Sequence, residues 1–289
     1  MKKIIVIFGH GYVSKFLSKV LSNSGWIVYC TSRQAELNNF DDNNNVKIIK
    51  FLDKDLYQVL KVADAILSTV PPDHHIIDHV LRQYKETISQ EKFRWVGYLS
   101  STGVYGHHDG AWVDEETKCQ PTNEQSQARL LAEEQWMSLH KDYHLPVHIF
   151  RLSGIYGPGR NCLEDIINGK DFTIIKEDQY FSRIHIEDIC QGVVASINLP
   201  TPGEIYNLSD DEPSRIDVVQ QFGASILKRN PLREIAFEEA CLSERAKMFF
   251  YDSKKVSNRK ILHKLNVTWK YPNYRDGLLH GCLPYLQLP

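Results

Sequence analysis

Two glycines near the start of the chain form the first group of residues whose spacing suggests chemistry. Gly9 and Gly11 follow the apolar run Ile4–Phe8 and precede residues 12–24, which have the pattern of a helix. A strand, a tight glycine turn and a helix together present backbone N–H groups and a helix N-terminus to a pyrophosphate. Ser14 stands where this pattern usually has its third glycine, and serine is small enough to preserve close packing of the helix on the strand. The spacing therefore favours a dinucleotide site over an ordinary turn without a ligand.

Hydroxyl side chains form a second group at the end of another apolar run. Residues 93–99 have the composition of a buried strand, and Ser100, Ser101 and Thr102 follow it directly. In doubly wound sheets, ligands bind beyond the carboxyl ends of the central strands. We therefore expect these hydroxyl groups to face a ligand.

The end of the second predicted strand bears on the choice of cofactor. An acidic residue there would accept hydrogen bonds from the ribose 2′-hydroxyl of NAD. The strand expected over 26–30 is followed instead by Thr31, Ser32 and Arg33. Two hydroxyl groups and a guanidinium suit a 2′-phosphate better, so we expect NADP, with NAD as the alternative. The other interpretation of Arg33 is a solvated surface residue.

Alternating strands and helices must position these groups. Further segments with strand or helix patterns follow in alternation at 46–52, 56–62, 63–70, 123–140 and 146–152. This alternation predicts an α/β fold, a Rossmann-type doubly wound parallel sheet. Asp53 follows one of these strands, and Thr69 lies near the end of the next. Pro71 stops that strand and would form a rigid wall beside the glycine turn.

Composition excludes several classes of protein. The chain has 289 residues, 42% apolar and 24% charged, and a net charge of -2. This balance gives no strong field for nucleic acid or an anionic membrane surface. No stretch approaches the ~20 apolar residues of a membrane span. The apolar run after Lys3 also ends too early for a signal peptide, because the glycine turn interrupts it.

The cysteines and histidines indicate neither a disulfide framework nor a metal site. Six cysteines are scattered along the chain with no C-x-x-C pair, which is typical of reduced thiols in a cytoplasmic protein. His75 and His79 are four residues apart and could share a helix face. No third ligand is marked, so we expect no metal.

Four stretches taken together resemble a known family. They are Phe8–Ser14, Leu99–Gly106, Arg151–Gly159, and Arg183–Ile189 with the later Gly203–Leu208. Their order and spacing resemble an atypical extended short-chain dehydrogenase/reductase of the NAD(P)-dependent epimerase/dehydratase type. The resemblance implies a Rossmann domain over residues 1–155, to which the chain returns at about 184–208. It also implies a smaller, mainly substrate-binding lobe over 156–289.

The resemblance also implies an activity and a set of functional residues. The activity would be oxidoreductase or epimerase chemistry on a sugar nucleotide or a similar polar carbonyl or alcohol, in a monomer or homodimer. Ser101 would hold the substrate oxygen. The implied cofactor-binding residues are Gly9, Gly11, Tyr12, Val13, Ser32, Arg33, Asp53, Thr69 and Pro71. The implied substrate-binding residues are Thr102, Ser153, Arg160 and His185, with Asp188 near the same crevice or its hinge.

The chain departs from this family at its catalytic pair. The family uses Tyr-x-x-x-Lys, in which lysine lowers the pKa of the tyrosine that transfers the proton. If Glu133 is the family's glutamate, Arg129 takes the lysine position and Gln125 the tyrosine position. No tyrosine occurs from residue 106 to residue 142. Glutamine does not relay a proton, whereas arginine can still hold the nicotinamide ribose.

Three interpretations of this departure remain open. Tyr105 could replace the missing acid, or it could be a packed aromatic residue. His185 could act from the second lobe, or it could be structural. Alternatively, the protein binds a dinucleotide as a sensor or interaction protein and has lost catalysis.

Overall fold

The computed structural model describes residues 2–34, 45–73 and 78–286, which form two compact units. Unit 1 comprises Met1–Val104, Asn123–Arg151 and Cys190–Tyr206. Unit 2 comprises Tyr105–Thr122, Leu152–Ile189 and Asn207–Pro289. Residues 105–122, expected above in the first domain, therefore belong to unit 2.

A seven-stranded sheet forms the centre of unit 1, in the order β11-β7-β5-β4-β1-β2-β3. Its strands are β1 (Ile4–Phe8), β2 (Ile27–Ser32), β3 (Val46–Lys50), β4 (Ala65–Ser68), β5 (Trp95–Ser101), β7 (Val147–Leu152) and β11 (Ile205–Leu208). Strand β1 pairs in parallel with β2 on one side and with β4 on the other. The predicted parallel α/β sheet is confirmed. The strand order reverses beside β1, which is where ligands bind in such sheets.

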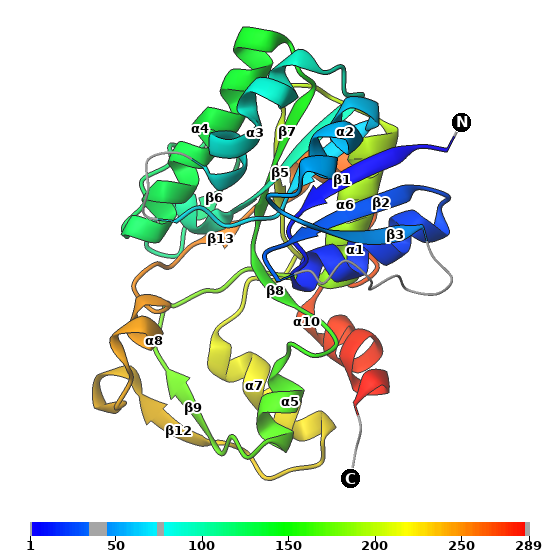
Figure 1. Cartoon of the computed structure of the whole chain (residues 1–289). Helices are drawn as coiled ribbons and strands as arrows, with labels where there is room; N and C mark the ends of the chain where they lie inside the picture. Colours follow the sequence, from blue (N-terminus) through cyan, green and yellow to red (C-terminus); the bar gives the residue numbers. More distant parts are fainter. Residues whose placement is uncertain (1, 35–44, 74–77, 287–289) are drawn as a thin grey trace. The chain divides into compact units, whose positions relative to one another are not determined.

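Helices cover both faces of this sheet (Figure 1). They are α1 (Tyr12–Asn23), α2 (Lys54–Val62), α3 (His79–Gln90), α4 (Glu124–Tyr143) and α6 (Ile186–Asn198). Helices α2, α3 and α4 pack on the face that carries Val6 and Phe8. All the side chains from Ile5 to Phe8 are fully buried, and each such side chain contributes roughly 1.5–3 kcal/mol on burial. Burial on both faces explains the continuous apolar run in the sequence.

Three short parallel strand pairs characterise unit 2: β8 with β10, β9 with β12, and β6 with β13. The strands are β6 (Trp112–Val113), β8 (Gly154–Tyr156), β9 (Phe172–Ile175), β10 (Arg183–His185), β12 (Arg233–Ala236) and β13 (Lys255–Val256). The helices are α5 (Cys162–Ile167), α7 (Ile216–Ile226), α8 (Glu244–Met248), α9 (Arg259–Leu265) and α10 (Tyr274–Asp276). Short helical turns lie at η1 (Thr102–Tyr105), η2 (Phe237–Glu239), η3 (Gly277–Cys282) and η4 (Leu283–Tyr285).

Candidate functional site

The turn after β1 requires glycine at residue 9 for two separate reasons. Gly9 has a φ of +107°, a conformation that L side chains rarely adopt. A Cβ atom there would also lie 2.4 Å from Oγ1 of Thr69. The Gly9 N–H donates to Oγ1 of Thr31 at 2.9 Å. The turn is therefore held by two threonine hydroxyls: that of Thr31 near the end of β2 and that of Thr69 just after β4.

The helix that follows this turn has an open N-terminus. Gly11 is the N-cap of α1, no side chain caps it, and its first turn contains no acidic residue. A Cβ atom at Gly11 would meet nothing within 4 Å. Helix ends of this kind leave backbone N–H groups without intrahelical partners, and these groups bind phosphate oxygens well.

Serine at the third position of the glycine pattern is accommodated by a hydrogen bond. Ser14 is buried, and its hydroxyl lies 2.8 Å from Oγ1 of Thr69, which in turn donates to the Phe8 carbonyl. Its neighbour Val13 is also buried, whereas the Tyr12 ring packs on Phe16 with 5.1 Å between centroids. Ser14 thus joins the helix to the strand instead of opening a gap.

His10 lies between the two glycines and brings no positive charge to the turn. Burial, with a smaller effect from Lys15, lowers its pKa from the ordinary value. Its Nδ1 atom is buried and makes no hydrogen bond to a residue that the structure describes. Pyrophosphate binding at this turn would therefore rely on backbone N–H groups.

The residues expected to contact the rest of the cofactor differ in exposure. Arg33 is exposed, and Oγ of Ser32 accepts the Gln34 N–H at 3.2 Å. Asp53 is the N-cap of α2, where its carboxylate accepts the Asp55 N–H at 3.0 Å. Pro71 is exposed two residues after Thr69. Asp53 therefore has a structural role in addition to any contact with adenine.

A buried network attaches α4 to β5 and β7. The Ser100 hydroxyl donates to Glu133 at 2.5 Å, and Nη2 of Arg151 donates to the same carboxylate at 2.8 Å. Nε of Arg151 supplies a further donor at 3.1 Å. Both ionic side chains are about 95% buried. Such a pair fixes the position of the helix along the strands, because removing either partner leaves a buried charge uncompensated.

Arg129 is held against β5 by two hydrogen bonds. Its Nη1 atom donates to the Tyr98 hydroxyl and to the Leu99 carbonyl, both at 3.0 Å. Its guanidinium also lies 5.7 Å from the Tyr98 ring centroid. Burial raises the pKa of Tyr98 despite this cation, so the phenol stays protonated near neutral pH. Arg129 therefore reaches the end of the strand that carries Ser101.

The hydroxyl of Ser101 is partly buried at the end of β5 and accepts the Gly103 N–H at 3.1 Å. Thr102 is buried beside it. Gln125 is exposed in the first turn of α4, which Asn123 caps by accepting the Ser126 N–H. The side chain at position 125 is thus accessible but carries no ionisable proton.

Tyr105 belongs to unit 2 and is fully buried. Its hydroxyl donates to Oδ1 of Asn207 at 2.8 Å, and the N–H of Asn207 donates to Glu115 at 2.7 Å. Ser153 is also buried, and its hydroxyl makes no hydrogen bond to a described residue. Arg160 is exposed on the turn after β8. The surroundings of Tyr105 are those of a packed aromatic residue.

His185 is buried between two tyrosine rings in unit 2. The centroids of Tyr156 and Tyr271 lie 5.2 Å and 4.2 Å from its ring. Burial lowers the pKa of His185 to about 4. Nearby, the Asp188 carboxylate accepts the N–H groups of Lys270 and Tyr271 at 2.7 Å and 3.1 Å. Burial raises the pKa of Asp188 to about 6.

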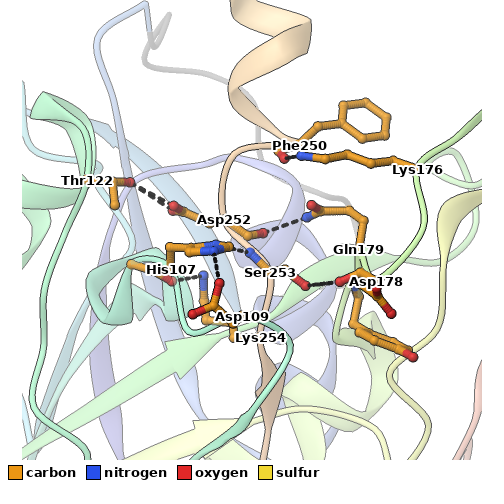
Figure 2. Close-up of polar contacts among 12 residues, drawn as sticks. His107, Asp109, Thr122, Lys176, Asp178, Gln179, Phe250, Asp252, Ser253 and Lys254 are labelled. Carbon is orange, nitrogen blue, oxygen red and sulfur yellow. Dashed lines mark hydrogen bonds and ion pairs between the residues drawn. The ribbon is translucent and has the colours of Figure 1, made fainter. Parts of the chain in front are cut away.

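The loop after Tyr105 is anchored by a distant segment, as Figure 2 shows. Nδ1 of His107 accepts the Ser253 N–H at 3.0 Å, while its Nε2 lies 2.8 Å from Asp109. Nζ of Lys254 donates to the Gly106 carbonyl at 2.9 Å. Pairing between residues so far apart in the chain explains why sequence reasoning did not place residues 105–122 in unit 2.

The described residues offer neither a cluster of metal ligands nor a membrane-spanning helix. The described residues contain no group of three or more histidine, cysteine, aspartate or glutamate side chains able to hold a metal ion. His75 lies outside these residues, so whether it shares a helix face with His79 is untested. No described helix is long and apolar enough to cross a membrane.

Known proteins match this chain along most of its length. A model of the NAD dependent epimerase/dehydratase family matches residues 4–209. A structure of a functionally unknown conserved protein from Silicibacter pomeroyi DSS matches at 39% identity, with 96% of each chain covered and a TM-score of 0.89. Protein YeeZ of Escherichia coli K12 is 25% identical, with 94% of this chain and 97% of YeeZ covered. The Bacillus cereus UDP-glucuronic acid 4-epimerase, in complex with NAD, has the same fold at 19% identity, with a TM-score of 0.80 and 98% of each chain covered.

Proposed function

Because this chain belongs to the NAD-dependent epimerase/dehydratase family, we propose that unit 1 binds a nicotinamide dinucleotide for chemistry on a sugar nucleotide or similar polar carbonyl or alcohol. The observation that carries the proposal is the turn from Gly9 to the open N-terminus of α1. The turn stands beside the reversal of strand order, where dinucleotides bind in this fold. The substrate class is supported by the Bacillus cereus neighbour, whose name specifies a UDP-sugar epimerase.

The proposed roles follow the elements that carry each residue. Backbone N–H groups from Gly11, Tyr12 and Val13 would bind the pyrophosphate, and Thr69 would border the nicotinamide ribose. Ser101 would hold the reacting substrate oxygen, and Arg129 the ribose. Thr102, Ser153, Arg160 and His185 are the proposed contacts to the rest of the substrate. The bound cofactor would supply or accept a hydride.

We propose NADP as the preferred cofactor because Arg33 offers an exposed guanidinium beside Ser32. A guanidinium matches the geometry of a 2′-phosphate and donates charge-assisted hydrogen bonds to it. Arg33→Ala should raise the Kd for NADPH roughly tenfold, because such a bond contributes about 1.4 kcal/mol or more. The Kd for NADH should change less than twofold. Gln34→Ala serves as the neighbouring control, and equal changes for both cofactors would assign Arg33 to the solvated surface.

Gly11→Asp tests the cofactor site itself. Aspartate is a good N-cap and its side chain would enter open space, so the variant should fold with unchanged or slightly higher Tm. Its carboxylate would repel the pyrophosphate and raise the Kd for NADPH and NADH at least tenfold. Ser243→Asp also places an aspartate at a helix N-cap, that of α8, where serine already caps the helix, and should leave both Kd values unchanged. Fluorescence titration of the apo protein measures the Kd values of both variants for NADPH and NADH. If the unmodified protein binds neither cofactor, the proposal is refuted.

A non-catalytic dinucleotide-binding protein is the second candidate. It is favoured by the amide at Gln125 and by the burial of Tyr105 against Asn207. Incubation with NADP, and in parallel with NAD, in the presence of UDP-glucose or UDP-glucuronic acid, followed by NMR of the sugar, separates the two candidates. Cofactor binding together with sugar turnover supports the enzyme, whereas tight cofactor binding without turnover of a wider sugar-nucleotide panel supports the second candidate. We also propose a cytoplasmic location, because all six cysteines are free thiols.

A further inference from the structure

We propose that a cavity in unit 2 binds a purine mononucleotide. The cavity has a volume of about 580 Å³, and every residue that lines it belongs to unit 2. Pockets of about 300–1,000 Å³ bury most of the surface of a small ligand. The lining combines an aromatic residue (Trp112), exposed acids (Asp114 and Asp211), a cation (Arg259) and aliphatic residues such as Leu262. The inference is independent of the proposed function, whose dinucleotide turn belongs to unit 1.

Trp112 supplies an exposed aromatic side chain at this cavity. It is 58% exposed, whereas the other four tryptophans of the chain are buried. Its neighbour Val113 is buried and pairs with Val256 of β13, and both valines also line the cavity. Aromatic side chains of this kind bind nucleobases by stacking on their planar faces. A base stacked on Trp112 would also remove the apolar surface of the indole from water.

Arg259 supplies a cation that no carboxylate of a described residue neutralises. Its side chain is exposed and forms no ion pair within the described part of the chain, although Asp114 and Asp211 line the same cavity. A guanidinium matches the geometry of phosphate oxygens and donates charge-assisted hydrogen bonds to them. Arg259 is therefore available for the phosphate of a ligand.

The two exposed aspartates each keep one carboxylate oxygen for a ligand. Oδ1 of Asp114 accepts the N–H groups of Glu116 and Thr117, both at 3.1 Å. Oδ1 of Asp211 accepts Nδ2 of Asn258 at 2.7 Å. Among the residues that the structure describes, none donates to Oδ2 of either aspartate. Carboxylate oxygens accept hydrogen bonds from the exocyclic amino groups of bases, so either Oδ2 atom suits an amino-bearing base.

Hydrogen bonds tie the walls of the cavity together. Asn258, which precedes α9, donates from Nδ2 to the Ser209 carbonyl at 2.8 Å as well as to Asp211. The Ser257 N–H donates to the Val113 carbonyl at 2.9 Å. These bonds join the start of α9 to the loop after β11 and to β6. The cavity is therefore preformed, and a ligand that enters it loses little affinity to ordering of the protein.

The size and the mixed charge of the cavity favour a nucleotide over simpler ligands. A polyamine would be attracted by Trp112 and the acids but repelled by Arg259. A free amino acid could satisfy both signs of charge, but it would fill only a small part of a cavity of about 580 Å³. A purine mononucleotide offers a planar base, an amino group and a phosphate in one molecule. AMP and GMP share this chemistry.

Isothermal titration calorimetry of the full chain with GMP, AMP and UMP tests the proposal. GMP and AMP should bind about tenfold more tightly than UMP, whose smaller base carries no amino group. Gly11→Asp, which blocks the dinucleotide turn of unit 1, should bind GMP as tightly as the unmodified protein does. The proposal is overturned if neither purine nucleotide binds, if UMP binds as tightly, or if Gly11→Asp loses GMP. Binding of spermidine without GMP would assign the cavity to a cation and overturn it as well.

Variants of the lining residues locate the bound nucleotide. Trp112→Ala should raise the Kd for GMP about tenfold because the stacked base loses its partner, and Trp112→Phe should restore most of the affinity. Arg259→Ala should raise the Kd for GMP about tenfold but change that for guanosine, which has no phosphate, less than twofold. Tyr285→Ala and Arg229→Ala, at other exposed positions of unit 2, are the matched controls and should change neither Kd. An unchanged Kd for GMP in Trp112→Ala or in Arg259→Ala would place the nucleotide elsewhere and overturn the proposal.

Discussion

Each unit places an arginine close to a buried carboxylate, yet the two couples are built differently. In unit 1, Glu133 receives three donors from Arg151 and Ser100. In unit 2, the carboxylate oxygens of Asp210 make no hydrogen bond to a described residue, while Arg183 donates to the carbonyls of Phe181 and Ser214. Burial raises the pKa of Asp210 well above its ordinary value. The first couple is thus an ion pair held by several hydrogen bonds, whereas burial of the second favours the protonated form of its carboxyl group.

The difference reflects the structural role of the charged side chains in each unit. Unit 1 must hold α4 against β5 if Ser101 and Arg129 are to fill the roles proposed for them, because those two elements carry them. An ionised pair with several hydrogen bonds gives the required orientation. Unit 2 meets no such demand at Asp210, whose backbone N–H bonds to the Arg183 carbonyl. Burial therefore shifts the Asp210 carboxyl toward its neutral form.

Loss of the ion pair in unit 1 should have the largest effect. Glu133→Gln removes the negative charge and leaves Arg151 buried without compensation, which costs about 3–5 kcal/mol of unfolding free energy. Urea denaturation measures this loss. Glu134→Gln, on the exposed side of the same helix, is the control and should change stability by less than about 0.5 kcal/mol. If Glu133→Gln and Glu134→Gln had equal unfolding free energies, the Glu133–Arg151 pair would not stabilise unit 1.

The sequence predicted the elements of unit 1 better than their contacts. Strand β1 and the turn at Gly9 follow from a local apolar run and local glycine spacing, so they were predictable. The close approach of Ser126 to Gly103 depends on how far α4 lies along the sheet, and the buried Glu133–Arg151 pair fixes that position. Residues 105–122 join unit 2 because Trp112 and Val113 pair with Lys255 and Val256, far along the chain. Neither relation leaves a signal in a single sequence.

Asp188 is an intermediate case. Among the described residues, two backbone N–H groups donate to its carboxylate and no cation forms an ion pair with it. Its pKa is raised to about 6 by burial, so the folded state binds a proton more tightly than the unfolded state. Stability is then greatest below the unfolded pKa of about 3.9 and falls as pH rises toward 6, by on the order of 3 kcal/mol.

Asp188→Asn should remove this dependence. Urea unfolding of the variant between pH 4 and pH 7 should lack the decline, although the amide bonds less well to two N–H donors and lowers stability by a constant amount. Asp165→Asn, at an exposed position in unit 2, should keep the profile of the unmodified protein. Parallel profiles for Asp188→Asn and the unmodified protein would mean that the carboxylate is ionised throughout this range.

Asp210→Asn should have the smallest effect near neutral pH and gives the closest contrast with Glu133→Gln. Both changes replace a buried carboxylate by its amide, but asparagine has nearly the shape of the protonated acid that burial favours at Asp210. We expect the unfolding free energy to stay the same or to rise slightly at pH 7, because the unfolded chain no longer gains from ionising this group. At pH 4, where the acid is already about half protonated in the unfolded chain, this gain should shrink. A loss of several kcal/mol at pH 7 would instead show that Asp210 is ionised and compensated by Arg183, and the two couples would then work alike.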